Sequence, residues 1–485
     1  MSKEILQLEP QRLWKHFCDL TLIPRPTGQM KEVTSFILNF GKNLSLETKQ
    51  DETGNVLIIK PASEGMKNAP TVILQSHLDM VPQKNSDVKH DFSKDAIQTY
   101  VDGNKVKAKS TTLGADNGIG VAAMLAILED KTLTHGRLEC LFTIDEEVGM
   151  IGAFGLKTGF LSGKILLNLD TEEEGDLTVG CAGGADVSAV FQYKDADADP
   201  NEAAYIIDLA GLRGGHSGGD IHEGRANANK LMARFLKECI FICDARLASI
   251  NGGSLRNAIP REASAVVSVL PENEELLLNL VKEYEEIYQE EYAGIEQALS
   301  LKAQKTRMPK TLVPEEIQDS LIHALAGCQN GVISMLAAFP GVVETSSNLA
   351  SVRTTEGKVE VNFLTRSSSE SRKDEICSSI QSVFALAGAK VEISNPYPGW
   401  QPDADSPTSE IMAKLFNEMF DREAKVQVVH AGLECGIILS STPGLDIVSF
   451  GPDIRNPHSP DEYVEIDSVG RFYRYLINIL ERLNV

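Results

Sequence analysis

Apolar positions in the first part of the chain follow two different periodicities. They repeat at helical spacing in residues 9–45, where the turn-forming loop Ile23-Pro-Arg-Pro-Thr-Gly28 interrupts the pattern. A further apolar stretch, 121–128, follows a glycine-containing loop and predicts a helix. Continuous apolar runs, which are typical of buried strands, lie at 54–60, 71–81, 138–144 and 164–169. Because such strands alternate with helices as far as about residue 186, the pattern predicts a parallel α/β sheet.

The pattern changes from about residue 187. Apolar and polar residues then alternate as in half-buried strands, at 202–210, 263–270 and 358–364. Two stretches, 225–242 and 272–304, have the periodicity of surface helices. This mixture predicts an α+β region with a fold of its own.

A proline-rich connector at 396–402 returns the chain to an α/β pattern. Helices are predicted at 409–420 and 468–483, and strands at 425–429 and 446–450. We therefore predict an α/β protein in which residues 1–186 and 401–485 form one discontinuous domain with a mostly parallel central sheet flanked by helices. Residues 187–400 form an inserted α+β domain in this prediction.

Length and charge narrow the classes of function. A chain of 485 residues is too long for one ordinary core, which agrees with two domains. The formal net charge of −23 argues against nucleic acid and anionic membrane as partners, because both need clustered Lys and Arg. No signal-peptide pattern and no run of 18 apolar residues occurs, so we expect a cytoplasmic protein. The eight scattered cysteines are expected to be reduced thiols.

Acidic and imidazole side chains stand where the predicted strands end, or in loops beside them. These residues are His77, Asp79, Asp116, Glu146, Glu147, Asp170 and His458. Open α/β sheets bind their ligands at the carboxyl ends of the strands, so we expect these side chains to share one site. Within it, Asp79 can accept the second ring N–H of His77, which fixes the tautomer of a metal-binding imidazole.

Five of these side chains form a ligand set for metal ions: His77, Asp116, Glu147, Asp170 and His458. Two imidazoles and three carboxylates without a thiolate suit Zn²⁺, Mn²⁺ or Co²⁺ better than a structural zinc site. They exceed one tetrahedral site but fit two metals if one carboxylate bridges, an arrangement that polarises a carbonyl and acidifies a shared water. Taken singly, His77-Leu-Asp79 also fits an ordinary strand end, and Glu146-Glu147 a solvated acidic turn.

At these residues the sequence resembles the dinuclear-zinc aminoacylase and carboxypeptidase clan. The motifs that carry the resemblance are His77-Leu-Asp79, Gly114-Ala-Asp-Asn-Gly118, Asp145-Glu-Glu-Val-Gly149, Asn168-Leu-Asp170 and Pro457-His-Ser-Pro-Asp461. Longer strings resemble one branch, the bacterial cytosolic aminoacyl-histidine dipeptidases. They are His77-Leu-Asp-Met-Val-Pro-Gln83, Ala182-Gly-Gly184, Gly214-Gly-His-Ser-Gly-Gly219, Arg256-Asn-Ala-Ile-Pro-Arg-Glu262 and His430-Ala-Gly-Leu-Glu-Cys-Gly436. The resemblance covers essentially the whole chain.

The resemblance implies two Zn²⁺ ions per chain, with Mn²⁺ or Co²⁺ as possible substitutes. Asp116 would bridge them, His77 and Asp170 would complete one site, and Glu147 and His458 the other. It further implies that the peptide between Asp116 and Asn117 is cis and that Asp79 orients His77. Glu146 would be the general base that takes the proton of the metal-bridged water and later donates it to the leaving amine.

The resemblance also implies that residues 187–400 form a lid and dimerisation domain. His216 would stabilise the oxyanion, although a solvent-exposed loop histidine is the simpler interpretation of that residue alone. Arg366 would bind the substrate carboxylate, a bidentate task suited to a guanidinium group. Here the chain has Leu364-Thr365 where many members of the clan have an acidic residue before the arginine. Asn348 and Glu434 are further substrate-binding candidates.

The sequence thus predicts a homodimeric metallopeptidase that hydrolyses unblocked dipeptides, preferentially Xaa-His dipeptides such as β-alanyl-histidine. The small peptide is the expected partner, with neither nucleic acid nor membrane. An N-acyl amino acid deacylase on the same scaffold is the alternative, because the metal ligands do not discriminate between the two. A non-catalytic binding protein would require a broken ligand set, and all five ligand positions and Glu146 are filled.

Overall fold

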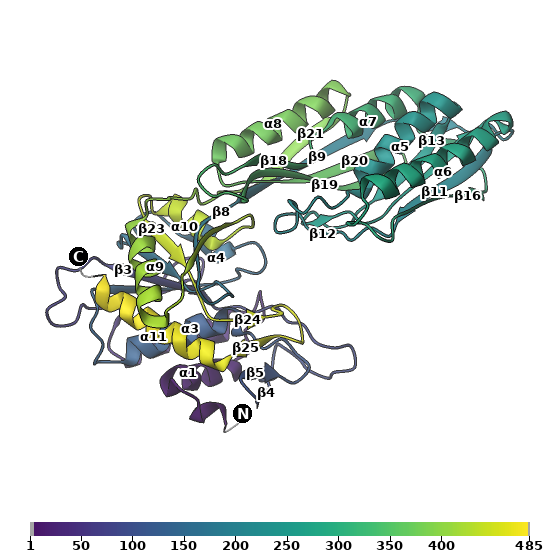
Figure 1. The fold of residues 1–485 in the computed structure, drawn as a ribbon. Coiled ribbons are helices and arrows are strands. Elements are labelled where there is room, and N and C mark those ends of the chain that lie inside the picture. Colours follow the sequence, from purple (N-terminus) through teal and green to yellow (C-terminus); the bar gives the residue numbers. More distant parts are fainter. Residues whose placement is uncertain (1–3, 484–485) are drawn as a thin grey trace. The chain divides into compact units, whose positions relative to one another are not determined.

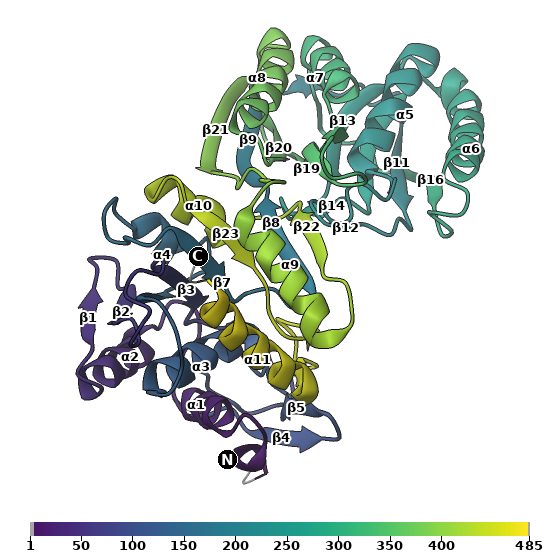
Figure 2. The same cartoon turned by 60° about the vertical axis from the view of Figure 1, so that its left-hand side comes forward.

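The computed structural model describes residues 4–483, and in this part of the chain it shows two compact units (Figures 1 and 2). Unit 1 comprises Met1–Gly180, Pro402–Val428 and Leu433–Val485, and unit 2 comprises Cys181–Gln401 and Val429–Gly432. Residues 181–186, which the sequence analysis assigns to the first domain, lie in unit 2. The reason is that the strand beginning at Gly183 pairs along its length with two strands of that unit.

Unit 1 is built on an eight-stranded sheet within the described residues. In order across the sheet, the strands are β1 (Glu47–Gln50), β2 (Val56–Lys60), β6 (Leu138–Thr143), β3 (Val72–His77), β7 (Ile165–Asn168), β23 (Asp446–Ser449), β8 (Asp176–Cys181) and β22 (Lys425–Val429). The central strands β6, β3, β7 and β23 are parallel, whereas β1, β2 and β8 pair antiparallel. The predicted parallel sheet is confirmed, with antiparallel strands at its sides.

Helices pack against this sheet and against one another. They are α1 (Gln11–Thr21), α2 (Lys31–Asn43), α3 (Ala115–Glu129), α4 (Ile151–Gly155), α9 (Pro407–Phe420), α10 (Glu434–Ser441) and α11 (Ile466–Arg482). Helix α3 is apolar on all sides and almost wholly buried, and it packs against α1 and β3 (Figure 2). A small sheet completes the unit, in the order β24 (Ile454–Arg455), β25 (Tyr463–Glu465), β5 (Lys105–Ala108) and β4 (Thr99–Asp102).

Unit 2 is an α+β unit built on a nine-stranded, antiparallel sheet. Its main path runs β16 (Ser300–Thr306), β11 (Ala203–Ala210), β15 (Ala263–Val269), β13 (Arg246–Gly252), β19 (Val343–Thr355), β20 (Lys358–Ser367), β9 (Gly183–Gln192) and β21 (Lys390–Tyr397), with β18 (Gly331–Met335) on β19. Two short pairs lie beside it, β12 (Gly215–His216) with β14 (Ala258–Ile259) and β10 (Ala196–Asp197) with β17 (Thr311–Leu312).

Four helices cover one face of this sheet and form its core (Figure 1). They are α5 (Ala228–Cys243), α6 (Glu274–Glu291), α7 (Glu315–Gly327) and α8 (Glu370–Leu386). Among residues 4–483 no helix is both long enough and apolar enough to cross a membrane.

Two local predictions are wrong. The helix predicted over 272–304 ends at Glu291, and residues 300–306 form β16 because they pair with β11 and bury Leu301. The helix predicted over 121–128 begins earlier, at Ala115, so Asp116 and Asn117 lie inside α3 with non-helical backbone angles, and Gly114 is the N-cap residue. The peptide between Asp116 and Asn117 is cis, as the resemblance implies.

Helix α5 offers a matched test of the unit 2 core. The side chain of Phe235 is fully buried, whereas Phe241 on the same helix is 86% exposed. Phe235→Ala is expected to lower the free energy of unfolding by about 3–5 kcal/mol, since it leaves a cavity, and Phe241→Ala by less than about 0.5 kcal/mol. Denaturant unfolding of both variants measures the difference, and equal losses would contradict this packing.

Candidate metal centre

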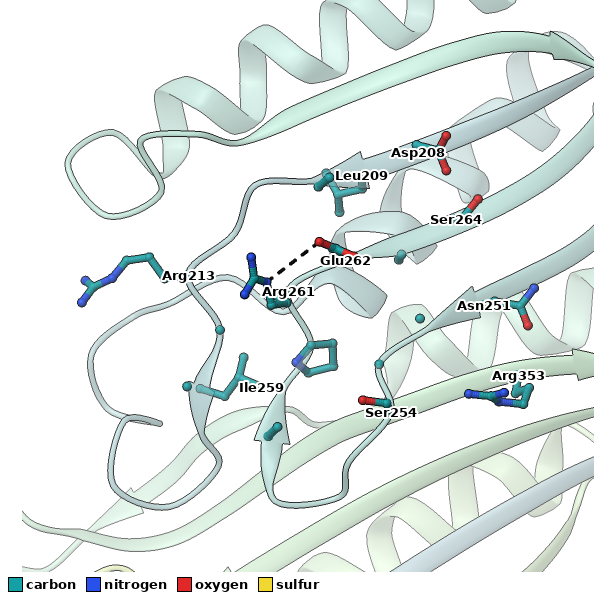
Figure 3. A pocket seen from close by; sticks show the side chains of 18 residues that line it. Asp208, Leu209, Arg213, Asn251, Ser254, Ile259, Arg261, Glu262, Ser264 and Arg353 are labelled. Atoms are coloured by element: carbon teal, nitrogen blue, oxygen red, sulfur yellow. Dashed lines mark ion pairs between the residues drawn. The ribbon is translucent and has the colours of Figure 1, made fainter. Parts of the chain in front are cut away.

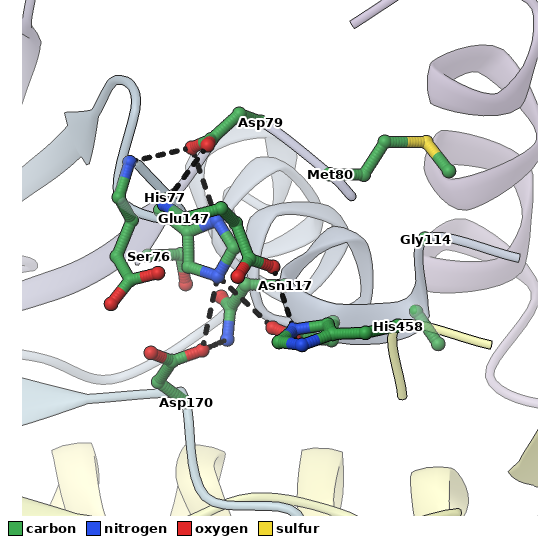
Figure 4. A network of polar contacts seen from close by, with 12 residues as sticks. Ser76, His77, Asp79, Met80, Gly114, Asn117, Glu147, Asp170 and His458 are labelled. Atoms are coloured by element: carbon green, nitrogen blue, oxygen red, sulfur yellow. Dashed lines mark hydrogen bonds and ion pairs between the residues drawn. The ribbon is translucent and has the colours of Figure 1, made fainter. Parts of the chain in front are cut away.

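The ligand candidates lie together at the carboxyl ends of the central strands of unit 1. In the parallel register His77 pairs with Thr143, and Gln75 pairs with Asn168. The residues just after these strand ends therefore emerge side by side, and they include Glu146, Glu147 and Asp170. Asp116 comes from the first turn of α3, and His458 from the loop between β24 and β25 (Figure 4).

The carboxylate of Asp116 lies between two imidazoles. Its Oδ1 is 3.0 Å from His77 Nε2, and its Oδ2 is 3.1 Å from His458 Nε2. His458 Nε2 is also 3.0 Å from Glu147 Oε1, and His77 Nε2 is 3.4 Å from Asp170 Oδ1. The side chains thus form two groups of possible ligands, each compact within 4.8 Å, that share Asp116. This donor set fits two neighbouring divalent cations joined by one bridging carboxylate.

Asp79 is fully buried and supports the ligand candidates through contacts with His77 and with the loop after β6. Its Oδ1 lies 3.3 Å from His77 Nδ1, which leaves Nε2 of that ring facing Asp116. The same carboxylate accepts the main-chain N–H groups of Glu146 at 3.0 Å and Glu147 at 3.2 Å. Asp79 therefore fixes both the ring of His77 and the loop that carries the two glutamates.

The crowding of carboxylates shifts the pKa values of the imidazoles. Hydrogen bonds to Asp116 and Glu147 raise the pKa of His458 to about 11. Burial opposes protonation of His77, but the charge of Asp170 and the hydrogen bonds to Asp116 and Asp170 outweigh it and raise its pKa. Burial opposes ionisation of Asp116 as well, yet the two imidazoles lower its pKa. Positive charge at this position is therefore strongly favoured, as expected of a cation site.

Glu146 has the properties of a general base beside this site. Burial raises its pKa well above the ordinary value; His77 opposes the shift, while Asp170 and Glu434 add to it. It forms a further compact group with His77 and Glu147, so its carboxylate lies next to a ligand. A base whose pKa is moved toward neutrality transfers protons in both directions most efficiently.

Glu434, at the start of α10, is fully buried near the same cluster. Its Oε2 accepts hydrogen bonds from Gln75 Nε2 at 2.6 Å and from Thr143 Oγ1 at 2.8 Å. Its Oε1 has no hydrogen-bond partner within the described part of the chain. Burial raises the pKa of this carboxyl to about 8. One oxygen of Glu434 is thus fixed by the protein, and the other is available to a ligand.

In unit 2, Arg366 on β20 is buried without a counter-ion. Its Nη1 donates to the Tyr397 hydroxyl at 2.9 Å, and its Nε has no partner among residues 4–483. No carboxylate of the described residues forms an ion pair with it. A buried guanidinium group with free donors favours an anionic ligand.

His216 lies in the short strand β12 of the same unit. Its Nδ1 accepts the N–H groups of Gly218 at 3.2 Å and Gly219 at 2.9 Å, so the neutral ring carries its proton on Nε2. Burial, and then the charge of Arg366, lower the pKa of His216. The ring is therefore held as a neutral donor, which suits stabilisation of an oxyanion.

The side-chain amide of Asn348, a candidate for substrate binding, makes contacts within the protein. The side chain is buried, and its Nδ2 donates to the carbonyl oxygens of Arg256 at 3.1 Å and Ala258 at 2.8 Å. Both amide hydrogens thus hold the loop before β14, and a substrate contact of Asn348 stays a prediction.

Two buried charged residues beside the metal centre were missed by sequence reasoning. Glu462 accepts the main-chain N–H groups of residues 113–116. Arg25 donates to the carbonyl oxygen of Gly114 in the same segment. Glu462 follows His458 by four residues, and Arg25 stands in the predicted loop between two helices. Neither position has a local pattern that indicates burial.

A separate recess of about 1010 Å³ lies on unit 2 (Figure 3). Asp208, Ser264, Asn251 and Arg353 line it from neighbouring strands, and Arg261 pairs there with Glu262 at 4.0 Å. None of the predicted site residues lines it. Its charged side chains are largely exposed to solvent, so they gain little from binding an ion.

The comparisons with known proteins agree with this geometry. Residues 73–482 match the model of peptidase family M20/M25/M40, and the chain therefore belongs to this family. The chain is 45% identical over 481 residues to the cytosol non-specific dipeptidase of Escherichia coli (strain K12), and the match covers 99% of both chains.

Solved structures agree as well. The aminoacylhistidine dipeptidase from Vibrio alginolyticus superposes with a TM-score of 0.93 at 45% identity, over 99% of this chain and 98% of that one. A tripeptidase from Staphylococcus aureus has a TM-score of 0.57 at 17% identity, over 98% of this chain and 99% of that one, and shares the fold.

The raised pKa values of His77 and His458 predict that metal binding releases protons. The raised pKa of each imidazole favours its protonated form in the metal-free protein, and that proton must leave before the ring binds a cation, so metal affinity is expected to fall as the pH falls. Titration calorimetry with Zn²⁺ in two buffers of different ionisation enthalpy measures the release. Heats that are identical in both buffers would contradict the prediction, and His458→Ala should release fewer protons than the wild type.

Proposed function

We propose that this protein is a dinuclear zinc dipeptidase that hydrolyses unblocked dipeptides and prefers Xaa-His substrates. The observation that carries the proposal is the carboxylate of Asp116 between two imidazoles, with Glu146 beside them. Membership of a peptidase family supports the reaction class, and the names of the two relatives with 45% identity support the substrate class.

In this proposal Asp116 would be shared by two metal ions. His77 and Asp170 would complete one site, and Glu147 and His458 the other. When bound, the ions would supply Lewis-acid polarisation of the peptide carbonyl and a more acidic water. Zn²⁺ suits two imidazoles and three carboxylates, and Mn²⁺ or Co²⁺ would substitute for it.

Glu146 accepts the proton of the attacking water on its carboxylate and then donates it to the nitrogen of the leaving amine. Its raised pKa makes both transfers favourable. Asp79 keeps His77 in the required tautomer through the contact with Nδ1. The neutral His216 donates its Nε2–H to the developing oxyanion.

In this proposal two further residues bind the charged ends of the substrate. The buried, unpaired guanidinium of Arg366 binds the terminal carboxylate, for which its planar donor geometry is suited. The unpartnered Oε1 of Glu434 accepts the free amino group. A substrate that lacks either charged end should therefore bind poorly.

We also propose a cytoplasmic homodimer that forms through the sheet of unit 2. The edge strands β16 and β21 at the ends of that sheet are the available surfaces for strand pairing. The acidic charge of −23 supports a protein without nucleic acid or membrane partners. Sedimentation analysis tests the dimer, and a monomer at micromolar concentration would remove it.

A matched substrate panel tests the reaction and the specificity. It contains β-alanyl-histidine, alanyl-histidine, leucyl-leucine, a tripeptide, N-acetyl-histidine and alanyl-histidine amide, each with zinc-loaded and chelator-treated protein. Metal-dependent cleavage is expected for the free dipeptides, fastest for Xaa-His, because Arg366 and Glu434 require both charged ends. Cleavage of N-acetyl-histidine alone would instead establish a deacylase, and no cleavage with metal bound would favour a binding protein.

Glu146→Gln tests the general base. The amide keeps the shape of the side chain but cannot take a proton, so kcat is expected to fall about 10²- to 10⁴-fold while both metals stay bound. Asp145→Asn is the control, because an amide oxygen can still accept the Gly28 N–H that Asp145 Oδ1 accepts now, at 2.6 Å. Metal content and turnover are measured for both variants, and undiminished turnover in Glu146→Gln would exclude this mechanism.

A further inference from the structure

The loop between α1 and α2 forms hydrogen bonds to the chain segments beside His77 and Asp116. Arg25, in the turn-forming segment that the sequence predicts, is 2% exposed. Its Nη1 donates to the carbonyl oxygens of Leu78 at 3.0 Å and Asp79 at 3.2 Å, and its Nη2 donates to the carbonyl oxygen of Gly114. One guanidinium group therefore connects the segment after His77 with the segment before Asp116.

The rest of the loop strengthens this connection. Met80 donates its N–H to the carbonyl of Arg25 at 3.1 Å, and Thr27 donates its N–H to the carbonyl of Met80 at 3.2 Å. The hydroxyl of Thr27 donates to Asp79 Oδ2 at 3.0 Å. Arg25 is thus bound to the segment after β3 through both its main chain and its side chain.

The segment that Arg25 contacts is also held from its other side. Glu462 accepts the N–H groups of Leu113 at 2.7 Å, Gly114 at 3.0 Å and Ala115 at 2.8 Å. The peptide groups before Asp116 therefore lie between a carboxylate that accepts their N–H groups and a guanidinium group that donates to the carbonyl oxygen of Gly114. This fixes the orientation of the backbone from which the bridging ligand projects.

The neighbouring glycines leave room for the guanidinium. A Cβ atom on Gly114, whose φ is +71°, would lie 2.6 Å from Arg25 Nη2. A Cβ atom on Gly118 would also lie 2.6 Å from it. The two glycines of the Gly114-Ala-Asp-Asn-Gly118 motif thus permit a contact that larger residues would prevent.

Arg25 offsets the negative charge of several carboxylates without forming an ion pair with any one of them. Among the described residues it forms no ion pair within 4.0 Å. Burial lowers the pKa of Arg25, while the charges of Glu462, Asp79, Asp116 and Glu147 oppose this shift, so the guanidinium group faces the negative charge of the centre. A cation in this place reduces the repulsion among the buried carboxylates before any metal binds.

We propose that Arg25 is a positioning residue of the metal centre: its guanidinium fork sets the place of Asp116 relative to His77 and thereby determines metal affinity. This inference rests on the metal centre of the proposed function. The hydrogen bonds of the Arg25 side chain within residues 4–483 go to main-chain carbonyl oxygens, so it acts through the main chain at Asp79 and Gly114.

Lys60 provides a matched control at the opposite end of α3. It is also a buried cation that donates to main-chain carbonyls, to Ile127 at 2.6 Å and to Asp130. Loss of either cation leaves buried carbonyl groups unpaired in the same unit. Only Arg25 lies beside the ligand segments.

The test compares Arg25→Met, Arg25→Lys and Lys60→Met as purified, metal-free full-length proteins. Zn²⁺ affinity is measured by competition with a chromophoric chelator, and the visible spectrum of the Co²⁺-loaded proteins reports ligand geometry. Arg25→Met is expected to weaken Zn²⁺ binding at least about 10-fold and to change the Co²⁺ spectrum. Arg25→Lys keeps the charge but loses the fork, so it should recover part of the affinity, and Lys60→Met should keep both properties.

Three results would overturn the inference. Zn²⁺ affinity within twofold of the wild type in folded Arg25→Met would do so, as would an equal loss in Lys60→Met. Should Arg25→Met fail to fold, wild-type affinity and spectrum in Arg25→Lys would have the same consequence. In each case the wild type still binds Zn²⁺ and the proposed function stands, whereas a wild type that binds no Zn²⁺ would remove both.

Discussion

The burial of several carboxylates around two imidazoles is the constraint on which unit 1 depends. An ionised carboxylate loses several kcal/mol of hydration when it leaves water, unless donors or cations replace that water. Asp79 receives main-chain N–H groups and the ring of His77, and Asp116 receives both imidazoles. The remaining negative charge is what makes the site selective for cations, and it explains why the imidazoles are so basic.

The fold meets this constraint with rigid elements. Three neighbouring parallel strands, β6, β3 and β7, end in register, so the residues after them converge without long loops. Helix α3 is buried on all sides and cannot shift easily, which fixes Asp116. The fifth ligand candidate, His458, comes from the last part of the chain, and the hydrogen bonds of Glu462 to residues 113–116 connect that part to α3.

The sequence predicted those parts of the fold whose signal is local. Continuous apolar runs located β2, β3, β6 and β7, and the change of pattern located unit 2. Residues 300–304 were assigned to a helix because an edge strand with few apolar residues carries little signal of its own, and its pairing with β11 is non-local. The boundary at residue 186 was wrong by six residues for the same reason, since β9 is defined by its partners.

The candidate site shows the same difference between residues that have a local sequence signal and residues that do not. The strand-end ligands could be found because polar residues at the ends of apolar runs are visible in the sequence. Asn348 could not be judged, because its use as a buried donor depends on a loop 90 residues away. Arg25 and Glu462 were missed because a charged residue in a polar loop gives no sign that it is buried.

The roles of the buried carboxylates follow from the donors around them. Glu462 accepts main-chain N–H groups on both oxygens and is fixed in place, so it can only support the backbone. Asp79 has its oxygens occupied as well, and it orients a ligand. Glu146 has no donor within hydrogen-bond distance of its carboxylate in residues 4–483, which suits the proposed role of accepting a proton and passing it on. Identical chemical groups within one small volume are thus assigned to support, orientation and proton transfer by their hydrogen bonds.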